Sequence, residues 1–298
     1  MKTVIALGNF DGVHLGHKAL FDKAKEIAFE NGLSPLVFTF NDNPANFLTP
    51  YHPVRQITPK MEKKRRIQNN VRNVYFMNFA DCVDMSAREF FLFLVNKFNA
   101  RAFVCGFNFS FGKGREGTPE MLKSLCDEFN FRCEIVGGVT DGDIVISSTN
   151  IRRLISMGRV VKANSLLTEP YSVTAKSVSG KKVGRKIGYP TINQRIDDSK
   201  VRLPRGVYIT RTEIKGKSYR SVTNIGFCPT FGDREERIET HIIDRKTKEL
   251  KSFNGFARVV FYDRIRDEIA FSSKEELKAQ IAKDISACRE YFASKKAK

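Results

Sequence analysis

The chain has 298 residues, a length that predicts roughly two domains. Hydrophobic residues make up 41% and aromatic residues 11%, which is enough for packed cores and excludes wholesale disorder. The net charge is +18, and residues 171–298 contribute most of it, with 29 Lys and Arg against 16 Asp and Glu. Such a surplus favours phosphate-bearing partners, whether nucleotide, nucleic acid or membrane surface, without choosing among them.

Composition also excludes several classes of protein. No run of about 18 uninterrupted apolar residues occurs, so we expect no transmembrane helix. The first residues reach Asp11 too early for a signal peptide and are better interpreted as a buried strand ending in a glycine turn. The six cysteines form no CxxC pair, and no Cys/His cluster has the spacing of a zinc site. Free thiols in a reducing cytoplasm are therefore expected.

Strand-like apolar runs alternate with amphipathic helical stretches through the first half of the chain. In Lys18–Phe29 apolar residues recur at the helical period, and Thr118 followed by Pro119 is typical of a helix start. This alternation indicates a parallel sheet covered on both faces, and we expect an α/β, Rossmann-like domain. The expected strands are Thr3–Leu7, Pro35–Phe40, Val74–Phe79, Ala102–Phe107 and Phe131–Val136, with further helices at Ser86–Phe98 and Pro119–Phe129.

The pattern changes after about Pro170, where short alternating runs separated by turns predict an antiparallel β-barrel. A connecting helix is expected near residues 150–168. A C-terminal helix is expected to start at Ser273 with a capping box to Glu276. The expected barrel strands are Tyr171–Val178, Val207–Ile214, Ser218–Ile225, Glu239–Asp244 and Ala257–Tyr262, and the apolar face of the helix is Leu277, Ile281, Ile285 and Cys288.

Two of the four histidines lie in the segment Gly8–His17, between the first strand and the first helix. Its glycines allow tight turns and close approach to a ligand, and the helix start offers free N–H groups to a phosphate. His14 and His17, three residues apart, can donate hydrogen bonds to charge that develops on that phosphate. The alternative interpretation is two surface histidines beside a turn.

The segment GNFDGVHLGH resembles the HxGH signature of the nucleotidylyltransferase superfamily, and more narrowly the adenylyltransferase half of the bacterial bifunctional riboflavin kinase/FAD synthetases. Residues 146–152, ISSTNIR, are similar to the motif that holds ATP phosphates in that family. Hydroxyls and N–H groups at a helix start, together with an arginine, suit a polyphosphate. By this resemblance the ATP-binding residues are Gly8, Phe10, Asp11, Gly16, Ser148, Thr149 and Arg152, and the catalytic residues are His14 and His17.

Residues 106–117 resemble the flavin-side loop of the same family, which implies that Asn108 and Phe109 bind the flavin. The loop also contains a GxGxxG from Gly112 to Gly117, so a dinucleotide-binding fingerprint is a competing interpretation. Two departures from the family pattern bear on the flavin contacts. Ser110 stands where the family has an arginine, and residues 41–44 lack the first proline and the usual histidine of the family's motif.

The densest basic stretch, residues 180–193, opens the second domain. In an extended segment Thr191 and Asn193 point to the same side, and their oxygens suit Mg²⁺. The glycine-punctuated loop before them, with Arg185 and Lys186, suits ATP phosphates, although it is not a Walker motif.

This stretch resembles the GRxLGxPTxN signature of riboflavin kinases, and matches to that family continue through residues 205–208, 224–226, 229–232, 238–244 and 265–271. The resemblance implies that Gly184 and Lys186 bind ATP, that Arg266 binds the flavin, and that Glu239 is the general base for the riboflavin 5′-hydroxyl. On composition alone Glu239 is a solvent-facing strand residue. Lys251-Ser252 replaces the usual Tyr-Gly.

The resemblance covers nearly the whole chain and implies a bifunctional enzyme, with an adenylyltransferase domain at 1–168 and a riboflavin kinase domain at 169–298. The expected substrates are riboflavin, FMN and ATP with Mg²⁺, the expected products FMN and FAD, and the expected location the cytoplasm. Two alternatives stay open: the same fold with only one activity, because of the departures above, or a basic nucleic-acid-binding protein, for which no clear motif is found.

Overall fold

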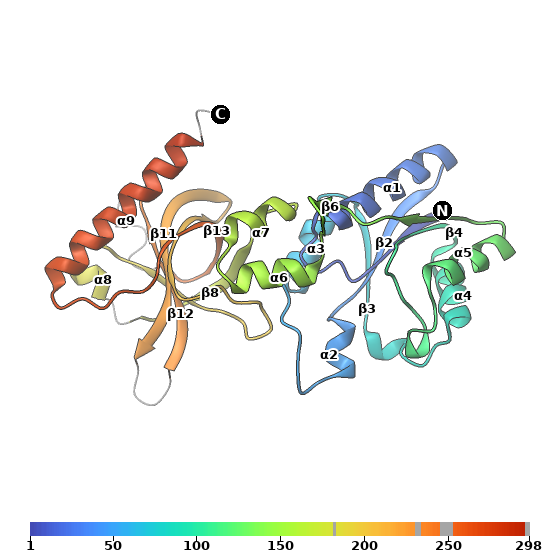
Figure 1. The fold of residues 1–298 in the computed structure, drawn as a ribbon, viewed down its shortest axis with the longest axis horizontal. Helices are drawn as coiled ribbons and strands as arrows, with labels where there is room; N and C mark the ends of the chain where they lie inside the picture. Colours follow the sequence, from blue (N-terminus) through green and yellow to red (C-terminus); the bar gives the residue numbers. More distant parts are fainter. Residues whose placement is uncertain (181–182, 230–233, 245–252, 296–298) are drawn as a thin grey trace. The chain divides into compact units, whose positions relative to one another are not determined.

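The computed structural model describes residues 1–180, 183–229, 234–244 and 253–295 (Figure 1). The chain divides into two compact units. The first comprises Met1–Ile151 and Leu166–Glu169, and the second comprises Arg152–Ser165 and Pro170–Lys298. The short segment Leu166–Glu169 thus belongs to the first unit, although the residues on both sides of it belong to the second.

A five-stranded parallel sheet forms the centre of the first unit, in the order β3-β2-β1-β4-β5. Along β1, Val4 and Ala6 face one side of the sheet while Ile5 and Leu7 face the other, as the period of a strand requires. All four are buried, so the predicted sheet covered on both faces is confirmed. The strands are β1 (Thr3–Leu7), β2 (Ser34–Phe40), β3 (Asn73–Met77), β4 (Ala100–Gly106) and β5 (Arg132–Val136).

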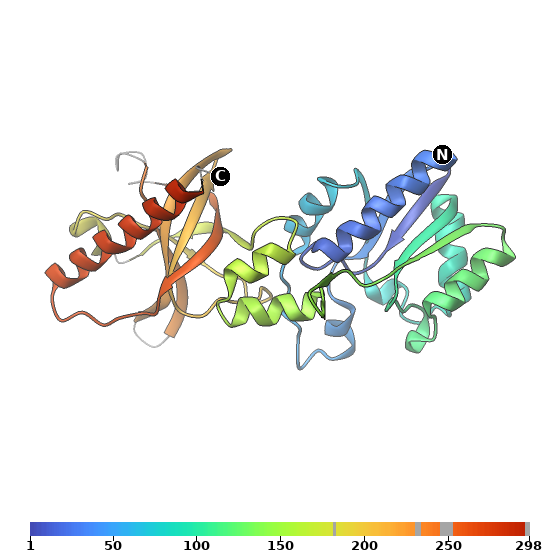
Figure 2. The same ribbon diagram turned by 45° about the horizontal axis from the view of Figure 1, so that its top comes forward.

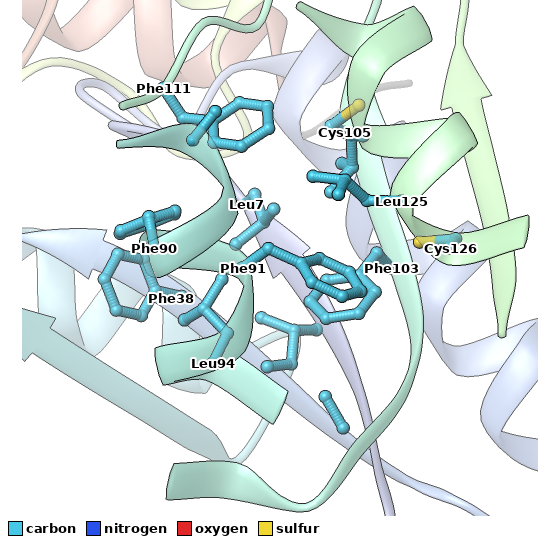
Figure 3. Packing of buried hydrophobic residues seen from close by; sticks show 14 of the residues in the cluster. Leu7, Phe38, Phe90, Phe91, Leu94, Phe103, Cys105, Phe111, Leu125 and Cys126 are labelled. Carbon is cyan, nitrogen blue, oxygen red and sulfur yellow. The ribbon is translucent and has the colours of Figure 1, made fainter. Parts of the chain in front are cut away.

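Helix α1 (Leu15–Asn31) covers one face of this sheet, and α4 (Ala87–Phe98) and α5 (Pro119–Glu128) cover the other (Figures 1 and 2). Aromatic side chains dominate the second face, where Phe90 and Phe91 of α4 pack against Phe38 and Phe103 of the strands (Figure 3). Burying aromatic side chains contributes much of the stability of such a core. Phenylalanine is accordingly the commonest large side chain in this core.

Two helices of the first unit were not expected from the sequence, α2 (Pro44–Leu48) and α3 (Lys60–Gln68). The sequence of α3, KMEKKRRIQ, has no apolar stripe, yet Lys63 and Arg66 are buried along with Ile67. Hydropathy patterns cannot find a helix whose buried face is cationic. Short 3₁₀ turns lie at Phe79–Asp81 and Lys113–Arg115.

The expected connecting helix is wrong in one respect, because two helices occupy that stretch, α6 (Ser148–Ser156) and α7 (Val160–Leu166). Gly158 lies between them with a φ of 73°, a left-handed conformation that ends helices and favours glycine. A small hairpin, β6 (Thr140–Asp141) and β7 (Ile144–Val145), precedes α6.

The second unit contains a closed antiparallel barrel in the order β10-β11-β12-β9-β8-β13, which confirms the predicted architecture. Lys215 and Gly216 both have positive φ in the β10–β11 turn, as a tight hairpin requires. A short helix, α8 (Val183–Lys186), precedes β9. The strands are β8 (Ser172–Val178), β9 (Ile192–Arg195), β10 (Gly206–Ile214), β11 (Lys217–Pro229), β12 (Arg234–Ile242) and β13 (Phe256–Arg266).

Helix α9 (Lys274–Ser294) packs its predicted apolar face on the barrel, with Ile285 and Cys288 against Val207 and Val222. Ser273 caps it by accepting the backbone N–H of Glu276, as expected. The second half of the expected capping box is wrong, because the Glu276 carboxylate accepts from Ser272 instead. Hydroxyl groups form a buried network between the barrel strands, made by Thr210, Thr212, Ser221, Thr223 and Thr240.

Candidate active sites

A cavity of about 540 Å³ opens at the carboxyl ends of the parallel strands. The strand order reverses at β1, which pairs with β2 on one side and β4 on the other. In open α/β sheets ligands bind at such a switch point. The structure brings most of the predicted residues of the first site together around this cavity: Gly8, Phe10, His14, Gly16, His17, Asn108, Phe109, Ser148 and Thr149.

The loop from Gly8 to His14 has an unusual backbone. Phe10, Gly12 and Val13 have φ values of 52°, 86° and 47°. Left-handed φ is uncommon for any residue with a side chain and is an outlier for a β-branched valine. Such strain persists only where the surrounding structure holds it in place, and it concentrates at functional sites. The surrounding structure therefore holds the backbone of this loop in a single conformation.

Asp11, predicted to bind ATP, is buried, and its carboxylate serves the loop itself. The carboxylate oxygens accept hydrogen bonds from the backbone N–H groups of Ile57 and Thr58, at 2.9–3.0 Å, and from the Thr58 hydroxyl at 3.2 Å. The Thr58 hydroxyl in turn accepts from the N–H of Gly12 at 2.8 Å. Asp11 is not among the described residues that line the cavity, so its carboxylate ties the loop to residues 57–58.

His14 and His17 form the start of α1 by capping one another. The Nδ1 atom of each ring accepts the backbone N–H of the other residue at 3.3 Å, and the rings stack with centroids 3.5 Å apart. Accepting at Nδ1 leaves the ring proton on Nε2. The pKa of His17 is held well below 6.5, first by burial and then by the charges of His14 and Lys63. His17 is therefore a neutral donor at pH 7.

Lys63 is a residue of this site that the sequence did not reveal. Its buried Nζ donates to the carbonyls of Asn9, at 3.1 Å, and Phe40, at 2.8 Å. Burial lowers the pKa of Lys63 to about 8, although the charges of Asp11 and Asp42 oppose the shift. Lys63 thereby joins the loop after β1 to the end of β2. A lysine in an apparently polar segment gave no signal for this role.

The first turn of α6 contributes Ser148 and Thr149 to the cavity. The N-cap hydrogen bond comes from a residue that was not predicted, because the Ser147 hydroxyl accepts the N–H of Asn150 at 3.2 Å. The Ser148 hydroxyl donates to the Asp11 carbonyl at 2.8 Å. In the first turn of α6 the backbone N–H of Ser148 has no partner within the helix, so it can face a ligand. Arg152 lies one turn further along α6 and is not among the residues lining this cavity.

The loop after β4 lines the cavity with Asn108, Phe109 and Phe111, and the two phenylalanine rings stack with centroids 5.5 Å apart. Ser110, which stands where the resembling family has an arginine, accepts a hydrogen bond from Nε of Arg115 at 2.9 Å, and both residues line the cavity. The guanidinium of Arg115, five residues further along the chain, therefore lies at the position of Ser110.

The glycines of the GxGxxG segment have packing roles. A Cβ on Gly112 would lie 2.6 Å from the backbone of Ala87, and one on Gly117 would lie 2.7 Å from the Phe111 ring. The segment forms a 3₁₀ turn and a bridge between Phe111 and Gly117, and the next helix starts only at Pro119. A dinucleotide fingerprint requires the glycines to open the helix directly, so that interpretation is wrong.

A second cavity, of about 220 Å³, lies in the barrel unit. Four predicted residues line it: Gly184, Thr191, Glu239 and Arg266. The other lining residues come from α9, from strands β10–β12, including Asn224 and His241, and from the loops that follow α8 and β13. Lys186 is exposed on α8, and neither it nor Asn193 is among the described lining residues. Three other predicted features, Lys181–Lys182, residues 230–232 and Lys251–Ser252, lie outside the described residues.

Polar side chains form a row across three barrel strands. Glu239 of β12 pairs in register with Asn224 of β11 on one side and Asn193 of β9 on the other. Directly paired residues of antiparallel strands point to the same face, so the three side chains share one face. Asn193 also donates from Nδ2 to the Thr191 hydroxyl at 3.2 Å, which confirms that Thr191 and Asn193 point together. Asn224 is a further residue of this site, and only the motif around it signalled its presence.

The loop between α8 and β9 is closed by backbone contacts. The N–H of Tyr189 donates to the Gly184 carbonyl at 2.7 Å, and a Cβ on Gly184 would lie 2.3 Å from the Tyr189 carbonyl oxygen. His241 supports the loop from β12 through a 2.9 Å contact of Nδ1 with the Pro190 carbonyl, and burial lowers the pKa of His241. Only glycine fits at position 184.

Arg266 lines the second cavity in a fixed orientation. Its Nε and Nη2 atoms donate to the two oxygens of buried Asp284 on α9, at 3.0 and 2.7 Å. Such a bidentate pair fixes the plane of a guanidinium. On the neighbouring loop Glu268 places its carboxylate against Gly226, where a Cβ would lie 1.9 Å away. Glu268 thus lines this cavity together with two other carboxylates, Glu239 and Asp284.

Comparison with known proteins agrees with this division of the sites. Residues 1–150 match the FAD synthetase family, and residues 167–292 match the riboflavin kinase family. Each matched stretch contains the corresponding cavity. Over the described residues, no helix is long and apolar enough to cross a membrane.

Curated relatives match over almost the full length. The chain is 35% identical to the bifunctional riboflavin kinase/FMN adenylyltransferase of Bacillus subtilis, covering 98% of this chain and 93% of the relative. It is 33% identical to the protein of that name from Escherichia coli, covering 97% and 92%. A solved structure described as a macrolide-efflux protein from Streptococcus pneumoniae superposes with a TM-score of 0.88 at 34% identity, covering 97% of this chain and 94% of that one. With both family matches in order along one chain, the chain belongs to the family of bifunctional riboflavin kinase/FMN adenylyltransferases.

Proposed function

We propose that the barrel unit phosphorylates riboflavin to FMN with ATP, and that the parallel-sheet unit transfers AMP from ATP to FMN, giving FAD and pyrophosphate. The observation that carries the proposal is the presence of two separate cavities, each lined by side chains suited to one of the two reactions. The family matches of the two halves support it.

In the kinase reaction, the 5′-oxygen of riboflavin attacks the γ-phosphorus of ATP and the bond to the bridging oxygen of ADP breaks. Glu239 accepts the proton of the 5′-hydroxyl, because it is the carboxylate in the polar row beside Thr191 and Asn193. Gly184 lets the backbone of its loop approach the ATP phosphates, and Lys186 supplies positive charge from α8. Arg266, held by Asp284, faces the flavin.

Mg²⁺ fits the oxygens of Thr191 and Asn193. The 3.2 Å hydrogen bond between them runs from the amide nitrogen of Asn193 to the hydroxyl of Thr191. A turn of the Asn193 amide would bring its oxygen to the hydroxyl, and both are neutral oxygen ligands that suit a hard cation. Among the described residues no group of three or more His, Cys, Asp or Glu side chains could hold a metal by itself. We infer that the ion arrives bound to the ATP phosphates, and that Thr191 and Asn193 complete its coordination. When bound, it neutralises charge on the phosphates.

In the adenylyl transfer, a phosphate oxygen of FMN attacks the α-phosphorus of ATP and pyrophosphate leaves. The reaction needs no protein nucleophile, so the site works by positioning and by stabilising charge. His14 and His17 donate from Nε2 to the phosphates, since their Nδ1 atoms are occupied by the helix cap. The free N–H groups at the starts of α1 and α6 add positive potential, with Gly8, Phe10 and Gly16 lining the path and Arg152 following on α6.

FMN occupies the side of the same cavity formed by the loop after β4. Asn108 offers polar contacts there, and Phe109, stacked on Phe111, offers an aromatic surface to the flavin ring. Arg115, hydrogen-bonded to Ser110, supplies the positive charge that the position of Ser110 lacks. In this way the departure at Ser110 is compensated, which favours retention of both activities over the single-activity alternative.

The functional domains are proposed as 1–168 and 169–298, and the enzyme is placed in the cytoplasm. The five cysteines described by the structure are all free thiols, as expected in a reducing compartment. ATP, riboflavin and FMN are its proposed partners. A role in nucleic-acid binding is not needed to explain the sites, because every proposed substrate except riboflavin is itself anionic.

The proposal is tested by incubating the protein with riboflavin, ATP and Mg²⁺ and separating the flavins by chromatography. We expect FMN and then FAD. His14→Ala is expected to lower FAD formation from FMN by a factor of about 10²–10³ and to leave FMN formation unchanged. Glu239→Ala is expected to do the reverse, by a factor of about 10²–10⁴. Wild-type protein that makes no FMN would refute the kinase assignment, and FMN without FAD would refute the adenylyltransferase assignment.

A further inference from the structure

The strained loop that carries His14 is held from behind by a segment far away in the sequence. The hydroxyl of Thr168 donates to the carbonyl oxygen of Val13 at 2.6 Å, and the Thr168 backbone N–H donates to the same oxygen at 3.2 Å. Leu167 forms an isolated antiparallel bridge with His14. The methyl group of Leu167 also packs over Gly12, where a Cβ would lie 3.3 Å from it.

These contacts meet the loop at its most strained residue. Val13 has a φ of 47°, and it directly precedes His14, which has the extended backbone of an N-cap, with φ −84° and ψ 175°. A β-branched residue left to itself leaves the left-handed region, and the peptide plane that joins it to His14 then rotates. The carbonyl of Val13 belongs to that peptide plane. Two donors from Thr168 therefore fix the orientation in which the His14 imidazole enters the cavity.

The segment is itself anchored at its next residue. Glu169 accepts a bidentate pair of hydrogen bonds from Arg65, at 3.0 and 2.5 Å, and a third from Asn69 at 2.8 Å. Its backbone carbonyl accepts from the buried Arg66 at 2.7 Å. All of these residues belong to the first unit. Thr168 thus presents its hydroxyl from a rigid support on α3.

We propose that Thr168 is a positioning residue for the adenylyl transfer, acting through Val13 on His14. The inference rests on the proposed function of the first cavity and adds to it a residue from outside the stretch that matches the FAD synthetase family, which ends at residue 150. Thr168 is not among the residues that line the cavity, so it acts without touching the substrates.

The test compares full-length Thr168→Val, Thr168→Ser and a matched control, Thr3→Val. Thr3 also donates a hydroxyl hydrogen bond to a distant carbonyl, that of Phe98 at 2.9 Å, but from the opposite end of β1. For each protein, kcat and KM are measured for FAD formation from FMN and ATP, together with riboflavin phosphorylation and unfolding in urea. Thr168→Ala takes the place of the valine variant if that variant does not accumulate in folded form.

We expect Thr168→Val to lower the kcat of FAD formation about tenfold or more with KM for ATP within twofold, because a misplaced catalytic group slows the reaction of bound substrate. Thr168→Ser keeps the hydroxyl and is expected to restore kcat. Thr3→Val is expected to lose stability without losing kcat, and riboflavin phosphorylation is unchanged in all three.

A Thr168→Val kcat equal to that of the wild type, or a Thr3→Val kcat that falls as far, overturns the positioning role. Failure of wild-type protein to make FAD from FMN would instead overturn the proposed function of the cavity.

Discussion

His14 and His17 are stacked face to face and each caps the other, so that two imidazoles with a ring separation of 3.5 Å share one helix start. Two rings this close cannot both carry a positive charge without strong repulsion. At least one ring is therefore neutral, and the lowered pKa of His17 identifies it as that ring. In the proposed adenylyl transfer both rings donate from Nε2, and the helix start adds positive potential.

This arrangement predicts that stability falls on acidification. The pKa of His17 is below 6.5 in the folded protein, so below pH 6.5 the unfolded chain binds more protons and unfolding becomes more favourable as the pH falls. His17→Gln is expected to flatten this dependence, since glutamine preserves the capping geometry without a titrating ring. Urea unfolding between pH 7.5 and 5.5 measures it. His52→Gln, at an exposed histidine, is the control, and a flattening in that variant would contradict the assignment.

Replacement of Lys63 by methionine is expected to destabilise the protein. The carbonyls of Asn9 and Phe40 lose their shared donor, at a cost of about 1–3 kcal/mol for each buried acceptor. Because the pKa of Lys63 falls from 10.5 to about 8 on folding, wild-type stability gains a contribution as the pH rises from 8 towards 10.5, and Lys63→Met lacks it. Urea unfolding across that range checks both effects. Lys64→Met, on the exposed side of α3, is expected to show neither.

Removal of the amide of Asn193 is expected to weaken the use of Mg²⁺ by the kinase. With Asn193→Ala, Thr191 remains as the only protein oxygen of the proposed pair, so the Mg²⁺ concentration for half-maximal FMN formation should rise about tenfold, the effect of roughly 1.4 kcal/mol. A titration of riboflavin phosphorylation with MgCl₂ at fixed ATP measures this. FAD formation from FMN in the same sample is the control, and an equal shift there would point to a general loss of structure.

Gly184→Ala is expected to impair only the kinase. The new Cβ would lie 2.3 Å from the Tyr189 carbonyl oxygen, so the loop before β9 must move, and we expect FMN formation to fall about tenfold or more. Gly255→Ala is the matched control in the same unit, because its Cβ would meet only an ordinary 3.4 Å contact with Phe253. Steady-state rates of both variants decide the point, and full activity of Gly184→Ala would remove this loop from the ATP site.

Much of the fold could be predicted because periodicity reports burial directly. Strand β1 was predicted at its observed bounds, and Thr118 caps α5 as expected, by accepting the N–H of Met121. The missed helix α3 has a clear physical cause. α3 buries a lysine and an arginine that are paired with carbonyls and carboxylates, and no hydropathy pattern signals a cation that is buried because it has partners.

The sites show the same division. The histidine pair was recognisable from its residue types and spacing, and Glu239 from the family resemblance, and all three line the two cavities. Residues that only hold these side chains in position were not recognised in this role from the sequence. Lys63 and Thr168 donate hydrogen bonds to backbone carbonyls. The carboxylate of Asp11, which was predicted to bind ATP, accepts the backbone N–H groups of residues 57–58. Such contacts join positions more than 20 residues apart, so local patterns contain no trace of them.

Because Leu166–Glu169 belongs to the first unit, the two units are interleaved along the gene. The path passes from one unit to the other at 151/152, 165/166 and 169/170, so neither unit is encoded by one continuous stretch of gene. A single recombination event near residue 150 would combine the adenylyltransferase half of one gene with residues 166–169 of another gene. Position 168 would then carry the residue of the second gene. The two halves of this enzyme are thus expected to be inherited together. A gene shortened to its first half would need another segment to hold the loop that carries His14.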